Sequence, residues 1–134
     1  MALAKHIYNY DTMVHNAKRL SQVSNILDIP VVATAQKNFK QIDERITEVE
    51  NRNRSVLIDK TDFSMYEFIK DHLDKNGDRK SVVLYGCESH ICVKQTALDL
   101  LENHYSVHIV VDAISSMQIQ DRNVGLAAMR DAGA

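Results

Sequence analysis

Two side chains of this sequence, Cys92 and Lys60, combine reactive chemistry with a favourable place in the predicted elements. Lys60 directly follows a short apolar run, Ser55–Asp59, that is typical of a buried strand, and Cys92 stands at the start of a predicted helix. Unpaired N–H groups at a helix N-terminus favour a thiolate, and a neighbouring ammonium favours it further. The same N–H groups can receive the oxyanion of a tetrahedral intermediate. Cys92 is therefore a candidate nucleophile.

Both residues also have ordinary structural interpretations. A cysteine near a helix start is most often a small core residue, and a lysine at a strand end is most often a solvated charge. Cys87 and Cys92 are the only cysteines, so a disulfide scaffold is excluded. Reduced thiols fit a reducing compartment, and we expect a cytoplasmic protein.

Two spacings suggest a zinc site. Cys87-x2-His90-x-Cys92 is compact for tetrahedral ligands, and His104-x3-His108 joins a predicted turn to a strand instead of lying on one helical face. Gly86 opens no dinucleotide or phosphate-loop pattern. We therefore expect neither a metal nor a cofactor.

Length and charge limit the partners. The 134 residues suit one domain, 1–134, and the net charge is −2 with the charges spread along the chain. No basic stripe is present to hold a phosphate backbone, and no apolar run approaches the length of a spanning helix. We expect neither a nucleic-acid partner nor a membrane.

Helical periodicity alternates with short apolar runs. We predict helices at about 6–27, 64–75, 90–103 and 121–130, strands at 31–34, 55–59, 81–86 and 106–111, and a loop or short surface helix at 44–53. This alternation is typical of an α/β fold with a parallel sheet covered on both faces. Ligands bind such sheets at the carboxyl ends of the strands, where Lys60 and Cys92 lie.

Four segments resemble those of the isochorismatase-like cysteine hydrolases, and most closely the isochorismatase domain-containing proteins. They are the nucleophile segment 81–100, the following strand and turn at 107–122, the lysine segment 60–65 and the strand at 29–34. The resemblance implies a Rossmann-like, three-layer parallel sheet of strand order 3-2-1-4-5-6. The matched segments begin after the family's first, central strand and end before its last one, so we expect this chain to lack both.

The family's catalytic triad is Asp, Lys and Cys. The resemblance assigns the lysine to Lys60 by a Lys-x-x-Phe-Ser pattern and the cysteine to Cys92 by a Gly-x5-Cys-Val pattern. The aspartate has no counterpart, and Asp11, inside a predicted helix, is not a replacement. The family's oxyanion hole corresponds to the backbone N–H groups of Glu88 and Cys92, after a cis peptide bond from Cys87 to Glu88. Cys87 is then a structural residue, with a resolving thiol as the alternative.

The resemblance implies a hydrolase acting on an amide or a related C–N or ether-type bond of a small-molecule substrate. Because the strands implied to be missing leave unpaired edges, we also expect self-association into a homo-oligomer. Without the aspartate we expect the chain as given to be inactive. The alternative is a non-catalytic, oligomeric interaction module. The nicotinamidase branch carries an Asp-x-His metal motif where Thr34–Lys37 stands, which argues against that activity. The substrate is not indicated, because the loop at 37–53 matches no known motif.

Overall fold

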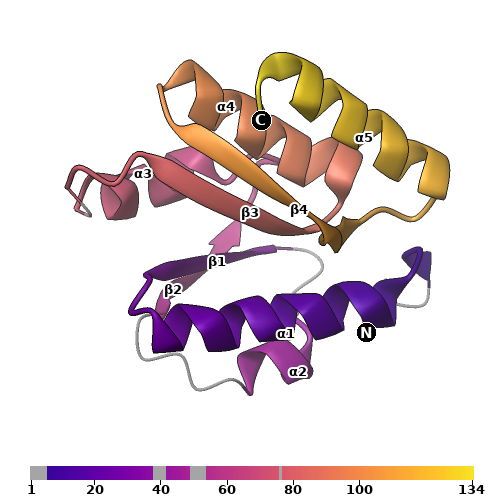
Figure 1. Cartoon of the computed structure of the whole chain (residues 1–134), viewed down its shortest axis with the longest axis horizontal. Coiled ribbons are helices and arrows are strands. Elements are labelled where there is room, and N and C mark those ends of the chain that lie inside the picture. Colours follow the sequence, from indigo (N-terminus) through magenta and orange to yellow (C-terminus); the bar gives the residue numbers. More distant parts are fainter. Residues whose placement is uncertain (1–5, 38–41, 49–53, 76) are drawn as a thin grey trace.

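Helices and strands alternate along the chain in the computed structural model, which describes residues 6–37, 42–48, 54–75 and 77–134, with the backbone alone at 54–58 (Figure 1). The elements are α1 (Tyr10–Ile26), β1 (Val31–Gln36), α2 (Glu44–Thr47), β2 (Arg54–Lys60), α3 (Tyr66–Asp74), β3 (Ser81–Cys87), the π-helical turn η2 (Ser89–Val93), α4 (Lys94–Glu102), β4 (Ser106–Ser115) and α5 (Ile119–Ala132). The predicted α/β class is confirmed.

The described strands form two parallel pairs instead of the one sheet we predicted. β1 pairs with β2, and β3 pairs with β4, but no ladder joins β1 to β3 among the described residues. In the first pair Gln36 lies opposite Lys60, and in the second Cys87 lies opposite Ser115. Each pair therefore brings polar or reactive side chains to the carboxyl ends of its strands.

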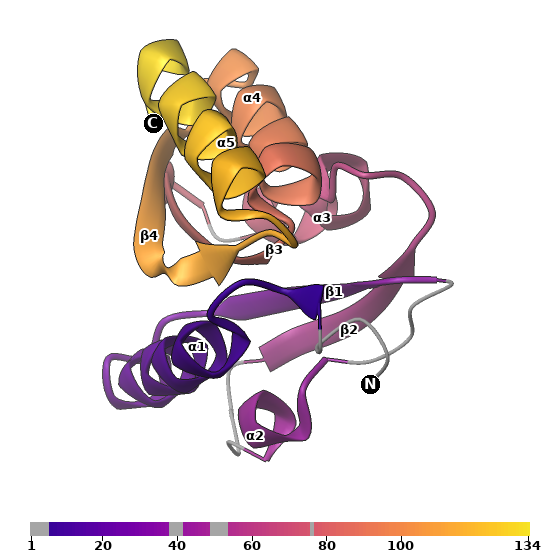
Figure 2. The same cartoon turned by 90° about the vertical axis from the view of Figure 1, so that its right-hand side faces the viewer.

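Helices cover both faces of the β3–β4 pair (Figures 1 and 2). α4 and α5 lie side by side over one face, and α1 packs on the opposite side against β4 and β3. The main core lies between the strands and α4 and α5, and consists of Leu84, Val93, Ala97, Leu100, Tyr105, Val107, Ile114 and Met129. This core fixes the elements that flank Cys92.

β4 is longer than the sequence predicted. The apolar run ends at Val111, and Asp112 follows it, but the ladder continues through the pairs of Gly86 with Ile114 and Cys87 with Ser115. Backbone hydrogen bonds hold a ladder, so a polar side chain does not end it. β1 likewise continues to Gln36, beyond the predicted end at Thr34.

The buried face of α1 also differs from the prediction. The helical period over the predicted 6–27 helix places Val23, Ile26 and Leu27 on the same apolar face as Val14 and Ala17, which are buried. The first three are instead 45%, 80% and 61% exposed. The helix residues that are buried are Met13, Val14, Ala17, Ser21 and Ser24. The inward stripe therefore continues through two serines, whose small side chains allow close packing.

The other helices are shorter or longer than predicted by a few residues. α3 begins at Tyr66, two residues later than predicted, and the Ser64 hydroxyl accepts a hydrogen bond from the Tyr66 N–H at 3.2 Å. The ambiguous segment at 44–53 contains the short helix α2, and its residues 49–53 lie outside the described ranges. Within those ranges, no helix has the length and apolar character needed to cross a bilayer.

Candidate active site

Lys60 ends β2 with its side chain turned into the protein. The residue is only 4% exposed, and its ammonium donates hydrogen bonds to Gln36 Oε1 at 2.6 Å and to the carbonyl oxygens of Asp62 and Phe63 at 2.7 Å each. A buried charge needs such polar partners, and these three oxygens match the three N–H donors of a lysine. The ammonium is therefore held in one place.

The fourth neighbour of this ammonium is the sulfur of Cys92. Lys60 Nζ lies 3.7 Å from Cys92 Sγ, although the residues are 32 positions apart in the chain. The two residues selected from the sequence are therefore brought together. At this distance an ammonium directly stabilises negative charge on the sulfur.

Cys92 lies in η2, a π-helical turn, and not in the first turn of an α-helix as predicted. The turn follows a cis peptide bond between Cys87 and Glu88, which the family resemblance implied. The Glu88 carbonyl accepts hydrogen bonds from the N–H groups of Ile91 at 3.2 Å and Val93 at 3.1 Å. Single π turns of this kind occur frequently at functional sites. The regular helix α4 begins only at Lys94.

Cys87, the second thiol, lies at the end of β3. Burial, with the neighbouring Glu88 carboxylate and Cys92, raises the pKa of the Cys87 thiol to about 11. At neutral pH this thiol is almost entirely protonated, and a protonated thiol is a poor nucleophile. These properties agree with a structural role.

The loop after β4 anchors the turn from a second side. Glu88 Oε2 accepts a hydrogen bond from the Met117 N–H at 3.2 Å, and His90 Nδ1 lies 2.9 Å from the Ser116 hydroxyl. Ser89, fully buried, donates its hydroxyl to the Arg122 carbonyl at 3.2 Å. Contacts on both sides therefore fix the turn that carries Cys92.

The sequence interpretation missed the residues that join α1 to α2. The Tyr10 hydroxyl donates to Asp43 Oδ2 at 3.0 Å, and Arg45 binds the other carboxylate oxygen of Asp43 at 2.9 Å and Asp11 at 2.8 Å. Burial and the Asp43 carboxylate raise the pKa of Tyr10 well above its ordinary value, and Cys87 contributes to this shift.

Neighbouring charges determine the pKa of Asp43 in the cluster of Tyr10, Asp11, Asp43 and Arg45. The guanidinium of Arg45 holds the pKa of Asp43 down to about 2. The Asp11 side chain is 88% exposed and its carboxylate binds Arg45. In the sequence, the only feature that pointed to this cluster was the loop at 37–53, which matches no known motif. Gln36 also escaped notice as a partner of Lys60.

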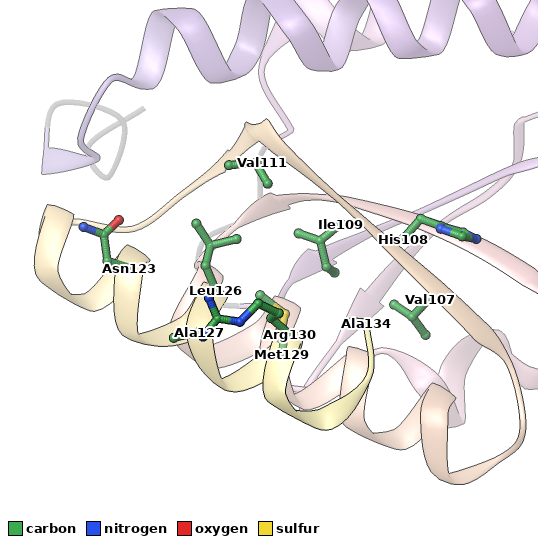
Figure 3. A pocket seen from close by; sticks show the side chains of 10 residues that line it. All are labelled: Val107, His108, Ile109, Val111, Asn123, Leu126, Ala127, Met129, Arg130 and Ala134. Carbon is green, nitrogen blue, oxygen red and sulfur yellow. The ribbon is translucent and has the colours of Figure 1, made fainter.

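Within the described ranges, no group of three or more His, Cys, Asp or Glu residues is placed to hold a metal ion. A cavity of about 510 Å³ lies elsewhere, between β4 and α5 (Figure 3). Its lining residues are Val107, His108, Ile109, Val111, Asn123, Leu126, Ala127, Met129, Arg130 and Ala134. Neither Lys60 nor Cys92 is among them, so this cavity does not belong to the candidate active site.

Comparison with known proteins gives the same family as the motifs. The family model described as "Isochorismatase domain" matches residues 1–134. Isochorismatase family protein 1B of Dictyostelium discoideum is 38% identical over 98% of this chain and 66% of its own length. The chain thus spans about two thirds of the length of such curated relatives.

Two solved structures are also similar. The MAR1 ribonuclease of Caenorhabditis elegans superposes with a TM-score of 0.91 at 36% identity, over 98% of this chain and 68% of that one. The YcaC gene product of Escherichia coli, named an octameric hydrolase of unknown specificity, has a TM-score of 0.81 at 18% identity, over 92% of this chain and 62% of that one. At that identity the second likeness concerns the fold alone.

Proposed function

We propose, from the premise that this chain belongs to the isochorismatase domain family, that it carries a cysteine-hydrolase site with Cys92 as nucleophile and Lys60 as its cationic partner. The observation that carries the proposal is the 3.7 Å contact between Lys60 Nζ and Cys92 Sγ. The bond attacked is of amide or related C–N or ether type in a small molecule, as the family resemblance implies. Its working compartment, in this proposal, is the cytoplasm.

The chemistry follows from the positions of these groups. For an amide, the Cys92 sulfur attacks the carbonyl carbon, a C–S bond forms, and the carbonyl electron pair moves onto oxygen. The backbone N–H groups of Glu88 and Cys92 are the proposed donors to that oxyanion. Collapse of the intermediate expels the amine with a proton and leaves a thioester, which water then hydrolyses. Lys60, held by three oxygens, stabilises the negative charge throughout.

A general base is needed to take the thiol proton. The described partners of the Lys60 ammonium are neutral oxygens and the Cys92 sulfur, and no carboxylate is among them. General-base assistance typically contributes about 10²–10⁴-fold to a rate. We therefore expect turnover by these 134 residues to be slow, even though the nucleophile can form its covalent intermediate.

The separation of the two strand pairs supports the family's strand order for this domain. In that order the first strand lies between the counterparts of β1 and β3, and these two strands share no ladder among the described residues. We propose that a complete domain of this kind holds a central parallel strand there. The carboxyl end of that strand, which bears the family's aspartate, would then lie beside the carboxyl ends of β1 and β3.

A burst experiment tests the nucleophile without requiring turnover. With p-nitrophenyl acetate, attack by the Cys92 sulfur forms an acetyl thioester and releases p-nitrophenolate, which is read by its absorbance. We expect a burst of about one equivalent followed by slow release. Cys92→Ala should abolish the burst and Lys60→Met should slow it, whereas Cys87→Ala is the matched control and should retain it. A full burst in Cys92→Ala would overturn the proposal.

An oligomeric, non-catalytic interaction module is the second candidate. The observation that favours it is the one-sided pairing of β1 and β3 in the described sheets, because unpaired strand edges invite pairing with another chain. The Escherichia coli relative is named an octamer, which makes a homo-oligomer a reasonable assembly for this family. Self-association together with an absent burst in the unmodified chain would favour this module.

The name of the Caenorhabditis elegans relative makes RNA a further substrate to test. The net charge of −2 argues against it, because nucleic-acid binding rests on positive charge. Incubation with a labelled single-stranded RNA should leave the RNA intact. RNA cleavage that is lost in Cys92→Ala would replace the proposed amide substrate.

A further inference from the structure

We propose that Thr96 is a positioning residue for this site, because its hydroxyl fastens the segment that orients Lys60 to the turn that carries Cys92. The inference rests on the proposed function, in which the Lys60 and Cys92 side chains work together. It assigns a role to a residue that lies outside the Lys-x-x-Phe-Ser and Gly-x5-Cys-Val patterns. Thr96 itself need not touch substrate.

The Thr96 side chain is buried and makes two hydrogen bonds in opposite directions. Thr96 is 2% exposed and lies in the first turn of α4. Its hydroxyl donates to the Cys92 carbonyl at 2.7 Å and accepts from the Met65 N–H at 3.0 Å. A hydroxyl has one proton to donate, so the direction of both bonds is determined.

Each bond reaches a different part of the site. The first bond, from Thr96 to the residue four positions earlier, is a common feature of threonine in helices and would not by itself suggest a special role. The second crosses from α4 to the start of α3, 31 positions away in the chain. A backbone N–H at the start of a helix has no acceptor inside that helix, so Met65 depends on such a partner.

The segment ending at Met65 also holds the lysine. The carbonyl oxygens of Asp62 and Phe63 accept two of the hydrogen bonds from Lys60 Nζ. A displacement of this segment therefore moves the acceptors of the ammonium. Through the Thr96 hydroxyl, the segment is joined to the backbone of Cys92 itself. The Thr96 hydroxyl thus helps to maintain the 3.7 Å separation between the Lys60 and Cys92 side chains.

Alkylation by two reagents of opposite character measures this separation. Iodoacetate is an anion and iodoacetamide is neutral, so the ratio of their rates at Cys92 reports a cation beside the sulfur. Lys60→Met should lower this ratio about fivefold, which is the Coulomb attraction of one ammonium for one anion at about 4 Å in water. Thr96→Val, which replaces the hydroxyl with a methyl group, should lower it at least twofold, whereas Thr96→Ser should keep the original ratio.

Controls separate positioning from a general loss of structure. Thr47→Val is the matched control, because Thr47 is exposed and, within the described residues, its hydroxyl donates to the Glu44 carbonyl in α2, at 3.0 Å. This variant should leave the ratio unchanged. Circular dichroism confirms that each variant is folded, and Thr96→Ala provides a second hydroxyl deletion, with the same expected loss, if Thr96→Val does not fold.

The outcomes are distinguishable. If Lys60→Met leaves the ratio unchanged, the proposed partnership of Lys60 with Cys92 fails, and the role of Thr96 fails with it. If Lys60→Met lowers the ratio but the folded hydroxyl deletions at Thr96 do not, only the positioning role is overturned. A loss in Thr96→Ser as large as the loss in Thr96→Val would also overturn it, because the serine hydroxyl retains both bonds.

Discussion

The two thiols of this chain should differ strongly in their rate of alkylation. The pKa of Cys87 is raised from an ordinary 9.0 to about 11, mainly by burial. With its pKa at about 11, Cys87 has roughly one hundredth of the thiolate of an unperturbed thiol at neutral pH. An opposing effect is that the thiolate that does form is more nucleophilic, because nucleophilicity rises with pKa. At a Brønsted coefficient of about 0.4–0.5 this raises the rate by about six- to tenfold. The net expectation is a rate about 10- to 15-fold below that of an unperturbed, accessible thiol.

Cys92 should react at least as fast as an unperturbed thiol, because the Lys60 ammonium lies 3.7 Å from its sulfur. The two sites should therefore differ by about tenfold or more. The assay is a time course with iodoacetamide at pH 7.5, followed by digestion and quantification of each modified peptide by mass spectrometry. The rate at Cys87 should also rise about tenfold for each pH unit until the pH approaches 11.

Labelling in denaturant provides the reference, because both thiols should then react at similar rates. The single variants Cys87→Ser and Cys92→Ser show that neither rate depends on prior modification of the other site. Equal rates in the folded chain, or faster labelling of Cys87, would refute the assignment of Cys92 as the reactive thiol.

Three further predictions concern packing, pH and assembly. A Cβ at Gly125 would lie 2.8 Å from the backbone of His90, so Gly125→Ala should lower the free energy of unfolding, measured in urea, by about 1 kcal/mol. The reason is that overpacking costs about 1–3 kcal/mol, which outweighs the roughly 1 kcal/mol helix preference for alanine. The exposed control Val124→Ala should change little, and a Gly125→Ala variant more stable than the unmodified chain would contradict the overlap. Arg45 lowers the pKa of Asp43 to about 2, so the Asp43 carboxylate should stabilise the fold fully above about pH 4 and progressively less as the pH falls to 2. The difference in Tm between the unmodified chain and Asp43→Asn should therefore shrink over that interval. A constant difference would count against the ion pair. The 134-residue chain should self-associate or aggregate in sedimentation velocity because, in the part of the chain that the structure describes, β1 and β3 are each paired on one side only. A clean monomer that unfolds on heating in one sharp transition would show that these edges need no partner.

Sequence patterns predicted the elements well where the chain alternates between buried helices and apolar strands. The helical period of the predicted 90–103 helix places Val93, Ala97 and Leu100 on one face, and these side chains lie in the core. At α1 the pattern failed only near the end of the helix, because periodicity selects a stripe of apolar residues but does not determine how far along the helix that stripe meets other elements. The buried stripe there passes through Ser21 and Ser24. It also failed at the end of β4, since ladders depend on backbone groups that every residue type carries.

The sequence by itself determined the reactive residue types and their order. Lys60 and Cys92 follow separate strands, and parallel strands place their carboxyl ends at one edge, so their convergence could be predicted from topology alone. Only the tertiary structure decided what surrounds them. Gln36 meets Lys60 because β1 and β2 pair in one particular register, and Thr96 joins Met65 because α3 and α4 pack together. These contacts depend on register and packing distance to within a hydrogen-bond length, which residue types and spacing do not encode locally.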